Sequence, residues 1–255
     1  MDILDRRNRQ LSVSSQEEIQ ESPAQEWLNH NYPKEQRDKH IELTIIGKNL
    51  KGELSLEGFD NLEILECRNN KLTKLDISTC SKLKIIDCGN NQLSSLDLFN
   101  SKELIILCCY NNKFANLDIS DCPNLETISC SNNSLTNLDL SNNLKLRLFD
   151  MADNNFPPQD LSFISHLVNL KNLAIGVSDE KKRKNEKGNQ FYGSFEPLKN
   201  MKKLEIYSID NTKIDKNSAR EYLPEIAKIF YCPTIQRLNL QVGSTWGNVR
   251  SGLLI

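Results

Sequence analysis

The chain has 255 residues, of which 26% are charged, and its 32 basic and 34 acidic residues leave a formal net charge of −2. Proteins dedicated to nucleic acid usually carry a strong basic excess, so this balance speaks against nucleic acid as a partner. The polar start of the chain lacks the apolar stretch of a secretory signal, and no window reaches the ~20 apolar residues that a membrane span needs. We therefore expect a cytoplasmic protein that does not associate with a membrane.

The first 40 residues divide into a polar tail and a short helical cap. Residues 1–22 are rich in Ser, Gln and Glu, a composition that predicts a disordered tail. Residues 23–40 begin with a proline, which suits the first position of a helix, so a short helix is expected there. Trp27, Leu28 and Tyr32 are the natural apolar cover for the first unit of the segment that follows.

Three ladders of residues recur every 21 positions in the next part of the chain. The leucine ladder consists of Leu62, Leu83, Leu104, Leu125 and Leu146. The asparagine ladder consists of Asn49, Asn70, Asn91, Asn112, Asn133 and Asn154. The third ladder consists of Ile46, Cys67, Cys88, Cys109, Cys130 and Met151. Because three independent ladders share one register, the sequence predicts a repeated structural unit.

One complete unit reads Leu62-x-x-Leu65-x-Cys67-x-x-Asn70-x-Leu72-x-x-Leu75-Asp76-Ile77. This pattern resembles the leucine-rich repeat in its short, 21-residue class, with Cys in the third apolar position. The resemblance spans residues 41–232. It implies an α/β solenoid, a right-handed superhelix with a parallel β-sheet on its concave face, and a role in binding other macromolecules. Each unit has too little apolar surface to fold alone, so the stacking of units makes the core.

The residues of a unit also indicate its local structure. Residues 65–67 alternate inward, outward and inward, which is the two-residue period of a strand. Asn70 turns inward, and its buried amide requires hydrogen bonds that the backbone of the turn can supply. The strand-like alternation occurs again in residues 75–77, 96–98, 117–119 and 138–140. We therefore predict a short second β-wall in the N-terminal half.

The repeats lengthen after Met151. Leu170 follows Leu146 by 24 residues, and Leu204 follows Leu170 by 34 because a polar insertion, residues 178–190, lies between them. The longer units leave room for a helical turn on the outer wall.

The last units are less regular. Leu204-x-x-Tyr207-x-Ile209 begins one unit, and Ala227-x-x-Phe230-x-Cys232 is expected to begin the last, although Leu238 and Leu240 offer a rival strand. We expect about eight coils in residues 41–232. Residues 233–255 form a poorly defined C-terminal segment.

The cysteines are interpreted mainly as residues that pack inside the solenoid. Cys67, Cys88, Cys109 and Cys130 occupy an inward position, where a free Cys behaves as a small hydrophobic residue. Parallel in-register side chains and an intracellular setting speak against disulfides, and the distant histidines and the lack of a CxxC pair speak against a metal. Cys108 faces outward and is interpreted as a surface thiol, with no histidine in register to activate it. We predict no catalytic residue, metal or cofactor.

Two further charge patterns have structural explanations. The recurring aspartates are expected to accept hydrogen bonds from the N–H groups of the following turn, whereas a calcium site would need several converging oxygens. These are Asp76, Asp97, Asp118 and Asp139. The basic run matches a short nuclear-import pattern, but interleaved acidic residues are typical of a solvated loop. It consists of Lys181, Lys182, Arg183 and Lys184.

The outward positions of the main sheet form the candidate binding site. One row carries an apolar stripe, expected to be exposed, and a contiguous patch of that kind usually marks an interaction site. Acidic side chains flank it, and Tyr110 is a typical interface anchor. The predicted site comprises Ile64, Glu66, Arg68, Ile85, Asp87, Ile106, Cys108, Tyr110, Leu148 and Asp150. The alternative is that aliphatic residues simply suit a β-ladder and shield its backbone.

These observations favour a non-enzymatic module that captures a protein or peptide on the concave sheet face. The acidic residues would favour a partner with Lys or Arg. An alternative is the targeting or adaptor part of a larger signalling enzyme or ubiquitin-ligase assembly whose catalytic segment is absent. A third possibility is a self-assembling array, but a monomer is expected. The partner's identity does not follow from the residues.

Overall fold

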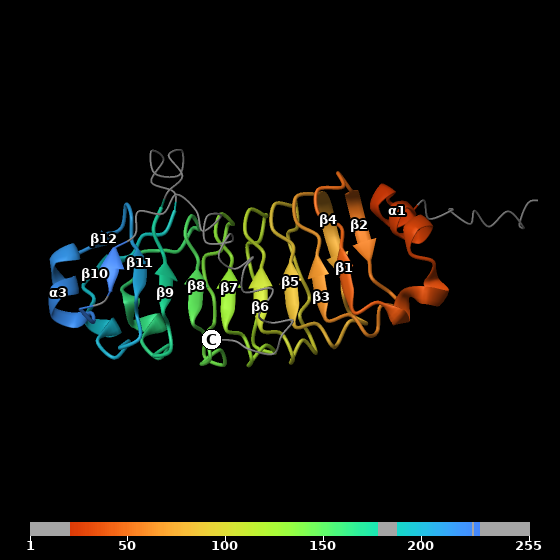
Figure 1. Cartoon of the computed structure of the whole chain (residues 1–255). Helices are drawn as coiled ribbons and strands as arrows, with labels where there is room; N and C mark the ends of the chain where they lie inside the picture. The colour runs from red at the N-terminus through yellow and green to blue at the C-terminus, as the bar shows by residue number, and fades with distance from the viewer. Residues whose placement is uncertain (1–20, 178–187, 226, 230–255) are drawn as a thin grey trace, which may run out of the picture.

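A computed structural model describes residues 21–177, 188–225 and 227–229. The chain forms a solenoid in which a strand from each coil joins one nine-stranded parallel sheet, with α1 (Pro23–Asn31) at one end and α3 (Ala219–Tyr222) at the other (Figure 1). In sheet order the strands are β1 (Glu42–Thr44), β3 (Ile64–Glu66), β5 (Ile85–Asp87), β6 (Ile106–Cys108), β7 (Thr127–Ser129), β8 (Leu148–Asp150), β9 (Asn172–Ala174), β11 (Ile206–Ser208) and β13 (Lys228–Ile229).

The strands are in register along the whole sheet. The central residue of each strand faces the core, and the residues on either side of it face the opposite way. The inward central residues of β3 to β11 are buried, and each pairs with its counterpart in the next strand; they are Leu65, Ile86, Leu107, Ile128, Phe149, Leu173 and Tyr207. The predicted alternation in residues 65–67 is confirmed. We call the side of the nine-stranded sheet opposite this core the outward face.

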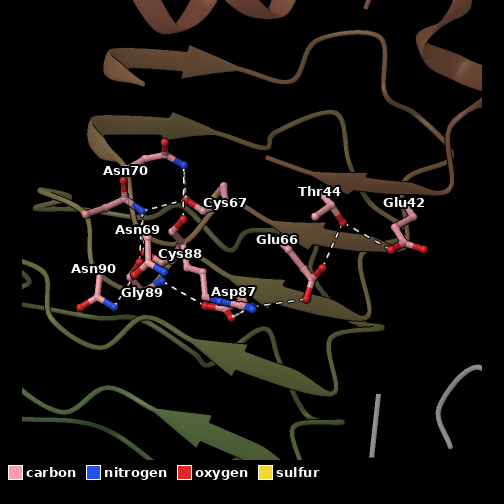
Figure 2. Close-up of polar contacts among 12 residues, drawn as sticks. Glu42, Thr44, Glu66, Cys67, Asn69, Asn70, Asp87, Cys88, Gly89 and Asn90 are labelled. Carbon is pink, nitrogen blue, oxygen red and sulfur yellow. Dashed lines mark hydrogen bonds and ion pairs between the residues drawn. The ribbon is translucent and has the colours of Figure 1, made fainter. Parts of the chain in front are cut away.

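Buried asparagines connect successive coils. The Asn91 Nδ2 donates to the carbonyls of Cys67 (3.1 Å) and Cys88 (3.0 Å), and its Oδ1 accepts from the Leu72 N–H (3.0 Å). Asn70 makes the corresponding bonds one coil earlier (Figure 2). Each side chain thus satisfies backbone groups of two coils, as predicted. Asn49, by contrast, is exposed with φ 57°, and so lies outside this buried ladder.

The second β-wall is shorter than predicted. β2 (Lys51–Ser55) and β4 (Lys71–Asp76) pair in parallel, and α1 packs against β2. Residues 96–98, 117–119 and 138–140 are not strands. There the wall is linked by backbone bonds such as Lys113 N–H to Leu93 O (2.8 Å), which do not extend into a ladder. The expected wall is therefore limited to the first two coils.

The N-terminal end is closed by α1 and by η1 (Lys34–Lys39), a 3-10 helix. Leu28 is fully buried, and Trp27 and Tyr32 pack against the core from partly buried positions. Arg37 was not predicted to contribute, yet it is buried and donates to the carbonyls of Tyr32 and Glu57, both at 2.9 Å. A buried guanidinium is tolerated because these acceptors satisfy its donors.

The longer coils carry helical turns on the outer wall, as expected. These are η2 (Leu161–Ile164) and η3 (Glu196–Leu198), with η4 (Lys216–Ser218) preceding α3. A small parallel pair, β10 (Tyr192–Gly193) and β12 (Lys213–Ile214), adds a further edge. Phe163 and Phe191 stack at 5.5 Å between ring centroids, and Phe156 packs against both. Aromatic rings thus fill the wider coils.

The last repeat begins one residue earlier than predicted. The expected alignment placed Phe230 opposite Tyr207, whereas β13 pairs Ile229 with Tyr207. A shift of one residue exchanges the two faces of a strand, so that prediction was wrong in register although a final strand is present. Phe230, Cys232, Leu238 and Leu240 lie outside the described residues, as do Lys181, Lys182, Arg183 and Lys184. The predicted divisions at residues 22, 40 and 232 stay predictions.

Candidate binding face

The described cysteines do not form a reactive site. The seven cysteines among the described residues are free and buried. Burial raises the pKa of the Cys80 thiol to about 11 and that of Cys122 to about 12, and it also raises the pKa of the inward Cys67 and Cys130. Thiols held in this way are poor nucleophiles, because the thiolate is the reactive form. The interpretation of the ladder as core packing is confirmed for these residues.

The recurring aspartates stabilise turns by accepting hydrogen bonds from backbone N–H groups. Their Oδ1 atoms accept from the N–H two residues further on: Asp76 from Ser78 (3.0 Å), Asp97 from Phe99 (2.9 Å), Asp118 from Ser120 (3.0 Å) and Asp139 from Ser141 (2.9 Å). The Ser78 N–H lowers the pKa of Asp76, because it stabilises the carboxylate. Within the described residues, no three His, Cys, Asp or Glu side chains form a group that could hold a metal ion. The prediction of a structural role is confirmed.

The outward face carries an apolar cluster separate from the main core. Its buried members are Ile85, Ile106, Cys108 and Tyr110, and Ile64 and Ile105 pack against them. The register places the isoleucines of β3, β5 and β6 side by side. The structure therefore brings together eight of the ten predicted site residues on β3, β5 and β6 and the residues that follow these strands. The other two, on β8, are separated from them by β7.

This cluster is not exposed, contrary to expectation. Ile85 is 0% exposed and Ile106 6%, so the apolar stripe was wrongly predicted to be open. Cys108 does face outward, but at 3% exposure it is not a surface thiol. Alternation along a strand predicts the side to which a residue points. It does not predict what lies over that side, which is why the sequence reasoning failed here.

A charged network borders the cluster on the side of β3 and β1. Arg68 Nη1 lies 2.7 Å from Asp87 Oδ2 and 3.4 Å from Glu66 Oε1. The Thr44 hydroxyl donates to Glu66 Oε2 at 3.0 Å, which extends the network to β1 (Figure 2). Burial raises the pKa of Asp87, while the hydrogen bond from Arg68 acts in the opposite direction. A buried acid paired with a half-buried arginine is costly to separate.

Tyr110 lies over Gly89 at the end of β5. A Cβ atom added to Gly89 would lie 2.5 Å from the Tyr110 Cζ, so only glycine leaves room for the ring. Sequence reasoning singled out Tyr110 as an anchor but missed this dependence. The signal was present, since Gly89 occupies the outward row between Arg68 and Tyr110.

The second acidic position of the outward face lies on β8. Asp150 is 1% exposed, and it accepts from the Ser129 hydroxyl (3.1 Å) and the Ala152 N–H (3.2 Å). Burial raises the pKa of Asp150 to about 6, although these hydrogen bonds favour the carboxylate. Leu148, on the same strand, is half-buried. A carboxyl group buried with neutral partners is a natural acceptor for a cationic ligand group.

A basic hollow of about 400 Å³ lies beside the start of the later strands. It is lined by Glu126, Lys145, Arg147, Asn169, Lys171 and Lys203. Most of these charges have neighbours: Lys145 donates to Asn124 (2.6 Å), and Arg147 pairs with Glu126 at 3.4 Å. This group was not predicted, because its members are far apart along the chain. Its pairs are half-exposed, so they contribute little individually.

Comparison with known proteins agrees with this geometry. The family described as leucine-rich repeats (2 copies) matches residues 60–101. The fold is that of leucine-rich-repeat proteins. A comparison with curated proteins found no match. Among the described residues, every helix is too short or too polar to cross a bilayer.

Leucine-rich-repeat proteins of known structure share the solenoid. An internalin C2 from Listeria monocytogenes has a TM-score of 0.60 at 17% identity, over 82% of this chain and 93% of its own. The functional domain of InlJ from the same organism, described as including a cysteine ladder, has a TM-score of 0.50 at 19% identity, over 76% and 55%. The ectodomain of the receptor kinase GASSHO1/SCHENGEN3 from Arabidopsis thaliana, in complex with CASPARIAN STRIP INTEGRITY FACTOR 2, has a TM-score of 0.58 at 21% identity, over 78% and 28%. The chain thus spans about half of the InlJ domain and about a quarter of that ectodomain.

Proposed function

We propose that this chain is a non-enzymatic recognition module that binds a protein or peptide on the outward face, at the ten residues predicted from the sequence. The observation that carries the proposal is the separate apolar cluster of Ile85, Ile106, Cys108 and Tyr110. This cluster is separate from the inward core, which the asparagine ladder accompanies on the other side of the sheet. Aromatic and aliphatic groups that a partner desolvates at the centre of an interface are typical of binding hot spots.

The charges around the cluster favour a cationic partner. Glu66 and Asp87 lie on one side of the cluster and Asp150 on the other, with Arg68 partly neutralising the first pair. A peptide with an apolar centre and flanking Lys or Arg would complement this arrangement. The receptor ectodomain with a bound integrity factor supports the proposal as an example of ligand binding by this fold. The seven free thiols support a reducing, cytoplasmic location.

The test is a selection of random peptides on the full chain, followed by measurement of each peptide's affinity. We expect the selected peptides to contain apolar residues beside Lys or Arg, and to lose binding to Ile64→Glu and Ile106→Glu. Ile64 is half-buried, so its substitution is the milder one. Phe99→Glu is the matched control, because Phe99 is 71% exposed and lies outside the nine-stranded sheet. Peptides that bind folded Ile64→Glu and Ile106→Glu chains as well as the parent would reject this face.

A further inference from the structure

The hollow at the start of the later strands carries an excess of positive charge. It is lined by four cations and one acid, Glu126, so its net charge is +3 although the whole chain carries a formal −2. The cations belong to the three successive coils of β8, β9 and β11, which are neighbours in the sheet (Figure 1). They are Lys145, Arg147, Lys171 and Lys203. We call this group of lining residues the basic hollow.

The equivalent part of the earlier coils is balanced in charge. Two rows of residues run along this edge of the sheet, one residue and three residues before the start of each strand. On the coils of β3, β5 and β6 these rows contain Lys82 and Lys84 together with Glu63 and Glu103. Lys84 pairs with Glu63 at 2.9 Å. The positive excess is therefore a local feature of the later coils and not a property of the repeat.

The partners of the cations in the basic hollow leave positive charge available. The Nζ atoms of Lys145 and Lys203 donate to neutral amides, those of Asn124 (2.6 Å) and Asn169 (2.7 Å). An amide oxygen accepts a hydrogen bond without neutralising the ammonium group. The other two cations form partly exposed ion pairs with N···O distances of 3.4 Å. An anionic ligand would thus meet two ammonium groups that no carboxylate compensates.

Two exposed aliphatic side chains lie beside the basic hollow. Leu144 is 53% exposed and Val168 43%, whereas most large apolar side chains of the described residues are buried. They directly precede the lining residues Lys145 and Asn169 in the chain. The Asn169 Nδ2 donates to the Leu144 carbonyl at 3.0 Å, so the two coils contact each other here. Cationic and apolar groups therefore occur together at this edge of the sheet.

We propose that the basic hollow, together with Leu144 and Val168, binds an extended acidic segment of a partner protein that also carries apolar residues. The cations extend over two strand spacings of ~4.8 Å, or about 10 Å, and alternate residues of an extended peptide lie ~7 Å apart. Two carboxylates of one segment can therefore reach cations on different coils. Apolar residues of the same segment would cover Leu144 and Val168.

The same surface is less suited to a phosphate group or to nucleic acid. Compact phosphate sites commonly use backbone N–H groups. Here the N–H groups of Arg147, Lys171 and Glu205 each donate to a carbonyl of the preceding coil at 2.8 Å. Aliphatic side chains and the Glu126 carboxylate also do not complement a phosphate backbone. The proposal concerns the edge of the sheet, so it does not rest on the cationic partner proposed for the outward face.

The first test compares two pairs of lysines in the full chain. The probe is a fluorescent peptide of alternating Glu and Leu, with binding measured by anisotropy at about 0.1 M salt. We expect Lys171→Gln/Lys203→Gln to weaken binding by about five- to tenfold. Lys82→Gln/Lys84→Gln is the matched control, because it removes the same charge from the same two rows at positions of the same exposure.

The control should change the affinity by less than about twofold. β5 lies four strand spacings from β9, about 19 Å, and the Debye length is about 10 Å under these conditions. Equal losses in the two lysine variants would overturn the proposal, as would a parent chain that does not bind the peptide. Displacement of the peptide by an equal charge of oligonucleotide or of anionic lipid vesicles would also overturn it.

The second test concerns the apolar pair. We expect Leu144→Ser/Val168→Ser to weaken the Glu–Leu peptide by about threefold or more and to leave a peptide of alternating Glu and Ser unaffected. Both positions are exposed, so the variant leaves the core intact. An unchanged affinity for the Glu–Leu peptide would overturn the proposal. Ile64→Glu should leave both acidic peptides bound, so failure of this proposal is distinguishable from failure of the outward-face proposal.

Discussion

The two sides of the nine-stranded sheet differ in how regularly their residues repeat from strand to strand. From Asn70 onward the inward side repeats the same set of residues from coil to coil: a buried central strand residue, a buried leucine and an asparagine that bonds to two coils. The outward side changes from strand to strand, from the Arg68–Asp87 pair to the isoleucine cluster and then to Asp150. Repetition is what stacking requires, whereas variation is what recognition of one ligand requires. The regular inward side accounts for the stacking of coils, and the variable outward side is the one that we propose for recognition.

The largest effect is expected on the inward side. Asn91→Ala leaves the carbonyls of Cys67 and Cys88 and the Leu72 N–H without this partner in a buried setting. We expect a loss of about 4 kcal/mol or more in the free energy of unfolding, measured by urea denaturation. The adjacent Gln92→Ala, at an exposed position, should cost less than about 0.5 kcal/mol. Equal losses would show that the asparagine ladder does not hold the coils together.

Two neighbouring isoleucines of β5 allow the contributions of the two sides to stability to be compared directly. Ile86 faces inward and Ile85 outward, and both are 0% exposed. We expect Ile86→Ala and Ile85→Ala each to lower the free energy of unfolding by about 3 kcal/mol, because both remove buried methyl groups. A cost for Ile85→Ala below about 1 kcal/mol would mean that the outward face is open in solution.

The next prediction concerns the contribution of Asp150 to the pH dependence of stability. Its pKa of about 6 in the folded chain lies above its ordinary value of 3.8, so between those values the folded chain binds more protons than the unfolded one. Stability should therefore fall as the pH rises from 4 to 6, by up to about 3 kcal/mol relative to Asp150→Asn. Chemical denaturation at several pH values measures the difference between the two chains.

Asp139 is the control for that pH series, because its pKa is shifted in the opposite direction. Hydrogen bonds in the turn at Ser141 lower the pKa of Asp139, so the stability it contributes is lost as the pH falls below its ordinary range. Parallel stability curves for the parent and Asp150→Asn would contradict the burial of this carboxyl group.

The smallest effect is expected at Gly89. An alanine there would contact the Tyr110 ring, and we expect a loss of about 1–2 kcal/mol in the free energy of unfolding. Tyr110→Ser should remove most of the penalty of Gly89→Ala, which a double-mutant cycle would show. Additive losses would place the Tyr110 ring elsewhere on the outward face.

Much of the inward side could be predicted from the sequence, because each inward residue occupies a structural position that recurs every 21 residues. From Cys67 and Asn70 onward the cysteine and asparagine ladders have the structure that their spacing indicated, as do the four aspartates. In the first coil the prediction was wrong, because Ile45 rather than Ile46 is fully buried and Asn49 is exposed.

Asn189 shows the limit of this reasoning. It bonds to the carbonyls of Met151 (2.8 Å) and Ile175 (3.0 Å) and so continues the asparagine ladder, but the insertion before it hides the period. The Asn189-x-Phe191 spacing was the available signal.

For the outward side, the sequence predicted which residues face outward but not how deeply they are buried. Alternation correctly placed Cys108 opposite to Cys109, but burial depends on contacts between parts of the chain that have no common period. The register of β13 failed for a related reason. Without a leucine at the first position, Ala227 did not distinguish two alignments that differ by one residue.

The most direct test of the covered outward face compares two neighbouring thiols, Cys108 and Cys109. Both are buried, one on each side of the sheet, and burial raises the pKa of both. In the native full chain with Cys232→Ser, labelling followed by peptide mass spectrometry should find both thiols protected to a similar degree. Labelling of Cys108 at the rate of an exposed thiol, with Cys109 still protected, would show that the outward face is open and would contradict the burial of its apolar cluster.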